Sequence, residues 1–240
     1  MKLFPTFSNF IKKVSFIHVI LVTILLLSCS AFAQKTISLV PLFNQKALKL
    51  DLYYLMDNKI DSIQFRTIKF YMSNITLLQD SAEVHTLEKQ HVLVDLANNK
   101  SQIIDIDIEN EISYNKIQFD LGIDPITSES GVFGGDLDPT NGMYWTWQSG
   151  YINFKIEGNS TTCPTQNHEF QFHIGGYQEP YNTSRIITLP LQQKENIVIQ
   201  LELSTLFSQI NFSETSSIMS PNQKAMKMAD KLTTIFRTTL

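Results

Sequence analysis

The stretch Ile197-Val-Ile-Gln-Leu-Glu-Leu203 decides the fold class, because Ile or Leu stands at every second position and alternates with the polar residues Gln200 and Glu202. Side chains of a β-strand alternate between two faces, so such a stretch buries one face and exposes the other. Residues 48–54 and 104–108 show the same alternation. A period of two with one polar face is typical of antiparallel strands that cover one side of a core.

Similar stretches fill most of the remaining chain. No long helical pattern and no internal repeat separates them, which favours an all-β protein over an α/β fold. We therefore predict an antiparallel β-sandwich. Its further predicted strands are residues 36–43, 66–79, 91–96, 114–122, 151–157, 168–174 and 185–189.

The C-terminus departs from the alternation and predicts one amphipathic α-helix at about residues 221–237. Ser220 suits the N-cap position, Pro221 suits the first turn, and Gln223 completes a capping-box pattern. The polar face is mixed in charge, so we expect the apolar stripe to pack on the sandwich and not on a membrane. That stripe consists of Ala225, Met228, Ala229, Leu232 and either Ile235 or Phe236.

The first 33 residues have the pattern of a signal peptide. A lysine-containing start is followed by an apolar segment and by the small-residue cleavage site Ala31-Phe-Ala33. We therefore expect an exported protein, periplasmic or secreted, whose mature chain has no transmembrane segment. An alternative is a lipoprotein anchored through Cys29, because Leu26-Leu-Ser-Cys29 resembles a lipidation signal.

Residues 34–240 are expected to form a single domain of a size that buries its own core. Removal of three lysines with the signal peptide leaves 16 basic and 23 acidic side chains, a net charge of −7. This mildly acidic balance argues against nucleic acid as a partner. Cys163 is the only cysteine after residue 33, so no internal disulfide can form.

An aromatic segment at residues 139–151 holds both tryptophans of the chain. In a strand, Trp145 and Trp147 would share one face and form either part of the core or the wall of a site. The segment follows an irregular stretch at residues 124–141 that is rich in glycine, proline, serine and threonine. Such long loops in a compact domain are usually functional or disordered.

His173 is the histidine best placed for a function. In the predicted strand at residues 168–174, three apolar side chains take one face, so His173 lies on the opposite, polar face, just before Gly175-Gly176. The alternative is a half-exposed histidine with a hydrogen-bond partner. His91 opens another strand and is expected at the surface.

The metal chemistry that fits these residues is that of copper. The spacing of cysteine and histidine matches no closed zinc site, and carboxylates are not arranged as in a calcium loop. Methionine and imidazole are ligands that suit copper better than magnesium or calcium. No nucleophile elbow or phosphate-binding loop is present, so we expect no enzymatic activity.

Several segments together resemble the MbnP-like family, in a version found in Bacteroidota-type secreted proteins. The most specific is Asn141-Gly-Met-Tyr-Trp-Thr-Trp-Gln-Ser-Gly-Tyr151, which is followed by Phe170-Gln-Phe-His-Ile-Gly175. Lys69-Phe-Tyr-Met-Ser-Asn-Ile75, Val92-Leu-Val-Asp-Leu96 and Phe119-Asp-Leu-Gly-Ile-Asp-Pro125 also resemble family strands. The resemblance covers nearly all of the mature chain.

The resemblance implies a β-rich periplasmic domain that holds copper with histidine and with a tryptophan oxidised to kynurenine by a partner dihaem enzyme. By position, the matching metal-site residues here are His173, Met143, Trp145 and Trp147. This chain departs from the family pattern at Ile126-Thr-Ser-Glu129, where copper-binding members carry Asn-His, and at Gly176-Tyr-Gln-Glu179. One expected histidine ligand is therefore missing.

Two other readings stay open beside copper binding. The first is a recognition module that stacks a glycan or a protein partner on exposed aromatic rings. The second is a structural domain without a ligand. The aromatic residues considered for recognition are the two tryptophans with Tyr144, Tyr151, Tyr177 and Tyr181.

Overall fold

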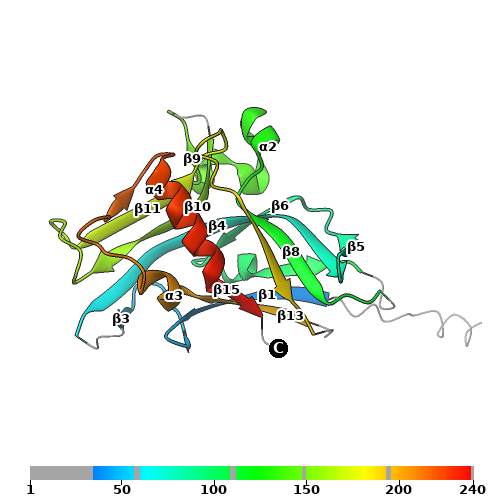
Figure 1. Ribbon diagram of the computed structural model, residues 1–240, viewed down its shortest axis with the longest axis horizontal. Helices are drawn as coiled ribbons and strands as arrows, with labels where there is room; N and C mark the ends of the chain where they lie inside the picture. Colours follow the sequence, from blue (N-terminus) through cyan, green and yellow to red (C-terminus); the bar gives the residue numbers. More distant parts are fainter. Residues whose placement is uncertain (1–34, 57–59, 109–111, 148–149, 193–195, 239–240) are drawn as a thin grey trace, which may run out of the picture. The chain divides into compact units, whose positions relative to one another are not determined.

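Two β-sheets pack face to face in the computed structural model, which describes residues 35–56, 60–108, 112–147, 150–192 and 196–238 (Figure 1). The smaller sheet has the strand order β15-β13-β1-β2, with β7 also paired to β1. Its strands are β1 (Lys35–Phe43), β2 (Lys46–Ala47), β7 (Ile103–Ile106), β13 (Asn196–Glu202) and β15 (Phe236–Thr238).

The larger sheet is built around β4, which runs for 18 residues and pairs along its length with four other strands besides β10. Its order is β12-β8-β4-β10-β11-β14, with β3, β5 and β6 also on β4 and β9 on β10. Its strands are β3 (Tyr53–Leu55), β4 (Ser62–Gln79), β5 (Ala82–Thr86), β6 (His91–Asp95), β8 (Lys116–Leu121), β9 (Tyr144–Trp145), β10 (Gly150–Ser160), β11 (Glu169–Gly175), β12 (Arg185–Pro190) and β14 (Ser217–Ile218).

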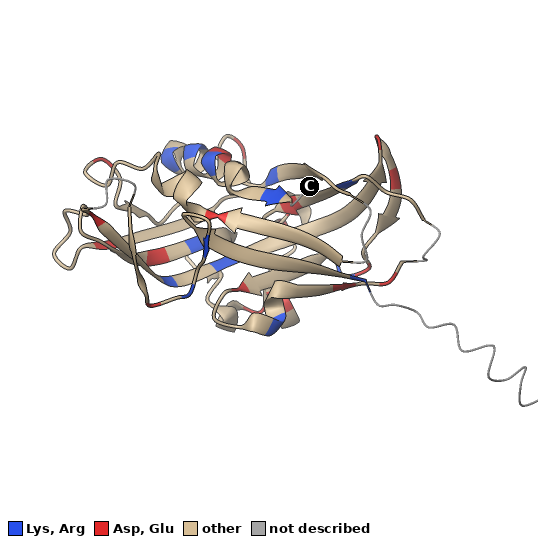
Figure 2. Cartoon of the chain, turned by 90° about the horizontal axis from the view of Figure 1, so that it is seen from below, with Lys and Arg blue, Asp and Glu red and all other residues tan. Residues whose placement is uncertain are grey.

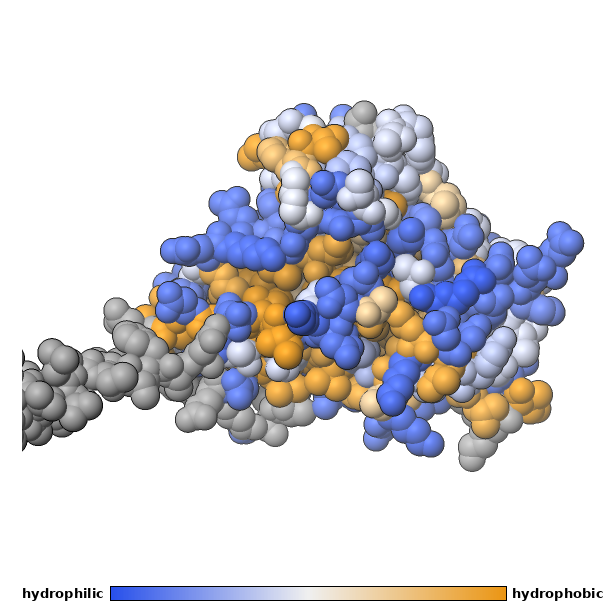
Figure 3. All heavy atoms as spheres, turned by 180° about the vertical axis from the view of Figure 1, so that it is seen from behind, coloured by the Kyte–Doolittle hydropathy of each residue, from blue (hydrophilic) through white to orange (hydrophobic). Residues whose placement is uncertain are grey.

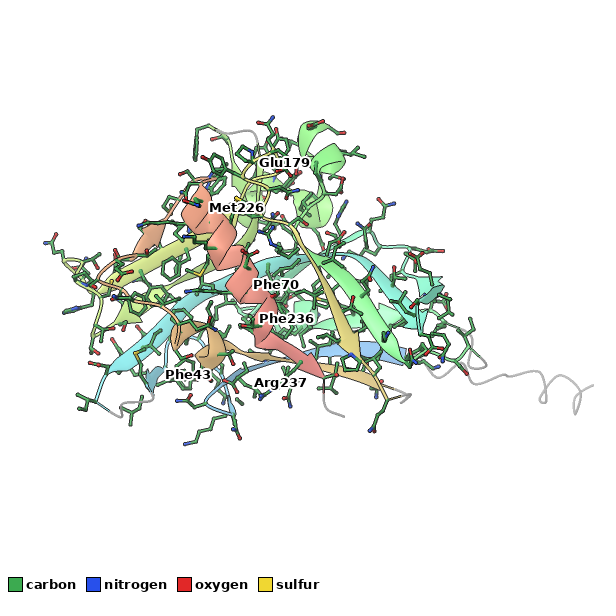
Figure 4. The ribbon with its side chains drawn as sticks, viewed as in Figure 1. Phe43, Phe70, Glu179, Met226, Phe236 and Arg237 are labelled. Carbon is green, nitrogen blue, oxygen red and sulfur yellow. The ribbon has the colours of Figure 1, made fainter. Side chains whose placement is uncertain are left out.

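The main core lies between the inner faces of the two sheets and is rich in phenylalanine. Phe70 of the larger sheet stacks on Phe154 with ring centres 4.9 Å apart and meets Phe236 of the smaller sheet edge-on at 5.8 Å. Figure 4 shows Phe70 and Phe236 side by side at this contact. Alternating apolar residues on each strand therefore supply the two halves of one sandwich core.

The predicted sandwich with a C-terminal helix is confirmed, but its strand pairs are not all antiparallel. β1 runs parallel to β13, and β11 runs parallel to β14. Alternation reports which face of a strand is buried and contains nothing about the direction of its neighbour, so the sequence pattern could not reveal these two pairs.

The strand predicted at residues 48–54 is mostly wrong. Only Tyr53–Leu55 forms a strand there, because Asp51 takes a left-handed backbone conformation with φ of 62° that interrupts the extended chain. Leu48 is buried, whereas Leu52 is 51% exposed. The alternation of this stretch is thus not the alternation of one continuous strand.

The terminal helix α4 covers Gln223–Leu232 and is shorter than predicted. Its N-cap is Asn222, whose side chain accepts a hydrogen bond from the amide of Ala225, and not Ser220. After Leu232 the chain tightens into the 3-10 turn η4 (Thr233–Ile235) and enters β15, where its backbone groups pair with β13. The predicted apolar stripe of α4 is buried in the main core.

The outer surface of α4 carries lysines, as Figure 2 shows, in agreement with a helix that packs on the sandwich through its other side. Two further helices are short: α2 (Pro125–Glu129) and α3 (Leu203–Phe207). Three more 3-10 turns are η1 (Asn99–Gln102), η2 (Gly135–Leu137) and η3 (Pro139–Asn141).

In the described part of the chain, no helix combines the length and apolar character needed to cross a membrane. The predicted signal peptide at residues 1–33, with Cys29, lies outside the described residues.

Candidate functional site

The irregular stretch before the aromatic segment is an ordered excursion over the outer face of the larger sheet. The side-chain carboxylate of Asp136 accepts a hydrogen bond from the amide of Leu93 at 2.8 Å. The backbone carbonyl of Asp136 accepts another from the Tyr71 hydroxyl at 3.0 Å. Lys69 donates to the carbonyl of Asn141 at 3.2 Å. These bonds attach residues 135–141 to strands β4 and β6.

A second, smaller apolar cluster fills the space between this excursion and the sheet. Met143, one of the four predicted metal-site residues, is fully buried in it, and Trp145 is 6% exposed. The Met143 side chain is thus surrounded by apolar packing. The members of the cluster are Tyr71, Ile123, Leu137, Met143, Trp145, Tyr151 and Ile152.

The two tryptophans contact each other with ring centres 5.6 Å apart, as the alternation predicts, although strand β9 ends at Trp145. Trp145 lies directly on Gly175 of β11, where an added Cβ would come within 2.8 Å of the indole ring. Gly175 is therefore required for this close approach. Trp147 covers Trp145 from outside and is itself 62% exposed.

His173 points to the outer face of β11, as predicted, but it is only 7% exposed. Its Nε2 lies 2.6 Å from Oε1 of Glu157 on the neighbouring strand β10. Lys155, which pairs directly with His173 across the strands, holds the same carboxylate oxygen at 3.4 Å. The alternative reading of a histidine with a hydrogen-bond partner was thus right about the partner and wrong about the exposure.

The Glu157 contact settles which nitrogen of His173 carries the proton. A carboxylate can only accept, so Nε2–H donates and the lone pair of a neutral ring lies on Nδ1. Among the described residues, none forms a hydrogen bond with Nδ1 of His173. Every fully buried side-chain nitrogen of the described residues has a hydrogen-bond partner, so Nδ1, which has none, is in contact with solvent. His173 thus presents a free lone pair.

Electrostatics keep the imidazole neutral. Burial lowers the pKa of His173 below its ordinary value, and the charge of Lys155 acts in the same direction, outweighing the opposite effect of Glu157. For Glu157, burial alone would raise the pKa, but the hydrogen bond from His173 and the charge of Lys155 together hold it below its usual range. The pair at neutral pH is a neutral imidazole and a carboxylate.

Trp145 and His173 are brought to the same face of the sheet. Gly175, on which the indole rests, lies two residues beyond His173 and therefore shares its side of β11, about 7 Å along the strand. The structure thus places the aromatic segment beside the predicted histidine.

Met219 follows strand β14, the neighbour of β11, and was not identified from sequence as a candidate site residue. Ile218 pairs with Phe172 at the end of the short parallel β11–β14 ladder, and Met219 is the next residue along the chain, as His173 is after Phe172. Exposure alternates from Ser217 through Ile218 to Met219, which is 40% exposed and hence faces the outer side. The parallel pairing of β14 with β11 brings this thioether to the side of the sheet that carries His173, and no local sequence pattern predicts such a pairing.

His91 lies elsewhere on the outer face and cannot share an ion with His173. Its Nδ1 is 2.9 Å from the Ser73 hydroxyl, Nε2 is 3.4 Å from that of Thr127, and burial lowers its pKa. Three strand spacings separate β6 from β11, which amounts to about 14 Å. The sequence-based expectation of a surface residue is only half right, since His91 is partly buried.

The remaining soft ligand type is also placed away from the site. Cys163 is buried, and its thiol donates to the carbonyl of Glu169 at 2.9 Å. Among the described residues, no group of three or more histidine, cysteine, aspartate or glutamate side chains could hold a metal ion. Any metal here would depend on His173 with thioether and aromatic neighbours.

The model of the family described as MbnP matches residues 33–220. The solved structure of MbnP from Methylosinus trichosporium has a TM-score of 0.54 and 12% sequence identity, over 78% of this chain and 80% of that one. At this identity the likeness shows the fold alone. Among curated protein sequences, none matches this chain.

Proposed function

Because this chain belongs to the MbnP family, we propose that it is an exported, non-enzymatic protein that binds copper as Cu(I) through Nδ1 of His173. The single observation that carries the proposal is the 2.6 Å contact between His173 and Glu157. Metal-binding histidines nearly always donate their second ring nitrogen to a carboxylate or carbonyl, which orients the ring and raises its basicity.

The neighbours of His173 favour a soft, singly charged ion. Met219 offers a thioether and Trp145 an aromatic wall, both of which suit Cu(I). The ammonium groups of Lys155 and Lys69 lie on the same face, one and two strands away, and repel a divalent cation more than a monovalent one. Met143 supports the site from below by packing in the same cluster as Trp145.

We also propose a partner, a dihaem enzyme, from the same family relationship. A dihaem enzyme that oxidises tryptophan would meet Trp147 first, because this ring is 62% exposed whereas Trp145 is 6% exposed. The proposed export, through the predicted signal peptide, would bring both proteins into the same compartment. Mass spectrometry of the protein purified from its native host tests the modification at either ring.

Titration with Cu(I) against a competing chelator tests the copper site directly. We expect micromolar or tighter affinity for the wild-type protein and its loss in His173→Ala, with an unchanged circular dichroism spectrum. His85→Ala, on strand β5, is the matched control and should bind as the wild type does. Affinity weaker than micromolar, or equal affinity in both variants, would refute the proposal.

Exposed aromatic rings support a second candidate, a recognition surface for a glycan or a protein. Trp147 and Tyr181 are 62% and 42% exposed. Tyr151, by contrast, is buried and Tyr144 is half-buried, so two of the tyrosines considered from sequence are not free to stack on a ligand. Binding of glycans that disappears in Trp147→Ala but persists in His173→Ala would favour this function over copper.

A further inference from the structure

A pocket of about 700 Å³ opens between β6 of the larger sheet and β7 of the smaller one, closed at its ends by η1 and η2. This volume lies within the range of small-molecule sites. Its apolar surface is the margin of the main core, and Figure 3 shows apolar residues exposed in a hollow between polar ridges on this side of the molecule. The apolar lining residues are Leu87, Val92, Leu93, Ile103 and Ile104.

The charged lining of this pocket is unbalanced. Two of its three lysines are already paired, Lys69 with Asp95 at 3.0 Å and Lys89 with Asp136 at 2.8 Å. The remaining lysine, Lys100, is outnumbered by three acidic lining side chains that form no ion pair with a described residue. These are Glu88, Asp105 and Asp107.

Asp105 and Asp107 follow an exposed apolar side chain on the same side of the chain. Exposure alternates along residues 103–107, so both carboxylates and the side chain of Ile103, which is 55% exposed, lie on one side of the chain. Two residues apart on an extended chain, the carboxylates are about 7 Å from each other. A cationic group between them would have an apolar stem against Ile103.

From this arrangement we infer that the pocket is a binding site for a small organic cation, an ammonium or guanidinium group on an apolar body. The carboxylates attract the charged end, and the exposed margin of the core takes up the stem. A small anion is disfavoured by the net acidic lining. A metal ion is disfavoured by the lack of converging ligands among the described residues.

The pocket is separate from the proposed copper site. Only Lys69 and Asp95 of the pocket lining belong to the row of residues that leads across β4 and β10 to His173. A ligand between Asp105 and Asp107 touches neither His173 nor Trp145. The pocket can therefore bind its ligand in a protein that holds no copper.

Titration of the ¹⁵N-labelled protein with octylammonium, octanoate and methylammonium, followed by NMR, tests the chemical class. We expect octylammonium to shift amide signals of residues 85–107 and to bind about tenfold or more tightly than the other two probes. Binding should weaken as salt is added. Equal binding of octanoate, or shifts centred outside residues 85–107, would overturn the inference.

A pair of double variants separates the pocket from overall charge. Asp105→Asn with Asp107→Asn should weaken octylammonium binding about fivefold or more. Glu129→Gln with Glu179→Gln removes the same charge outside the pocket lining and should change binding about twofold or less. Equal weakening in both, or no octylammonium binding at any accessible concentration, would refute the site.

Discussion

The imidazole of His173 and the carboxylate of Glu157 form a 2.6 Å hydrogen bond between adjacent strands, on the outer face of the larger sheet. This bond fixes the tautomer and ring orientation before any ligand arrives, so the cost of ordering the side chain is already met. The ammonium group of Lys155 lies 3.4 Å from the same carboxylate oxygen of Glu157.

Glu157→Gln should therefore weaken Cu(I) binding about 10–100-fold without abolishing it. The amide can still accept from Nε2–H, but it supplies no negative charge, and Lys155 loses its counter-ion. Competition titration with a Cu(I) chelator measures the effect. Glu169→Gln, on the same face of β11 but paired with Arg66, is the control and should leave the affinity unchanged.

The pH dependence of stability follows from the buried His173 and the partly buried His91. Burial lowers the pKa of both His173 and His91 below 6.5, so the unfolded chain takes up protons at a pH where the folded protein does not. The stabilisation is complete above about pH 6.5 and is lost as the pH falls through and below that value. Glu157 adds to the loss at lower pH, because its pKa is also lowered in the folded state.

Urea unfolding at pH 7.5, 6.5 and 5.5 measures this dependence. We expect the free energy of unfolding to decrease over that range in the wild type and to decrease less in His173→Gln. A free energy that is constant over the range, or that rises on acidification, would contradict the assigned charge states.

Gly175→Ala should disturb the aromatic segment. The added Cβ would lie 2.6 Å from the carbonyl oxygen of Tyr151 and 2.8 Å from the Trp145 ring, and the backbone oxygen cannot give way cheaply. We expect a loss of about 1–3 kcal/mol in the free energy of unfolding and a shifted tryptophan emission. Gly134→Ala, where no atom lies within 4 Å of the new methyl group, should be close to neutral. Equal stability of the two variants would count against the packing described.

Most of the fold could be predicted because alternation is a local property. The residues of β8, for example, alternate between partly exposed and buried positions as their sequence does. The parallel pairing of β1 with β13 could not be predicted, since it joins residues about 160 positions apart through contacts that leave no periodic trace. Asp51 shows the other limit, because its positive φ interrupts a stretch whose alternation predicts one continuous strand.

The candidate site was predicted only in part, for a related reason. The face of His173 follows from its own strand, but its partner Glu157 depends on the register of β10 against β11, and Met219 depends on a parallel neighbour. Met143 was predicted as a metal-site residue from the resemblance alone, and its sequence pattern could not separate that role from packing, because methionine serves equally as a soft ligand and as a core residue. The structure shows its packing role.

Helix α4 is capped by Asn222 and not by the predicted Ser220, and substitution of the two residues tests this difference. Asn222→Ala removes the bond from the Ala225 amide and should lower the free energy of unfolding by about 1 kcal/mol. Ser220→Ala, at the position predicted from sequence, should cost about half of that or less. Urea denaturation of both variants decides between the two caps, and a larger cost for Ser220→Ala would restore the sequence-based assignment.

The two tryptophans should differ sharply in acrylamide quenching and in their contribution to stability. Trp147→Phe leaves the buried Trp145 as the only indole, so quenching should be weak, whereas Trp145→Phe leaves the exposed Trp147 and should give strong quenching. Trp145→Ala should cost about 3–5 kcal/mol, because it empties the second cluster beside Met143. Trp147→Ala should cost about 1 kcal/mol or less, since more than half of its surface is in water and it loses mainly the contact with Trp145. If both alanine variants were equally unstable, Trp147 would be part of the core, and neither a partner enzyme nor a stacking ligand could reach it.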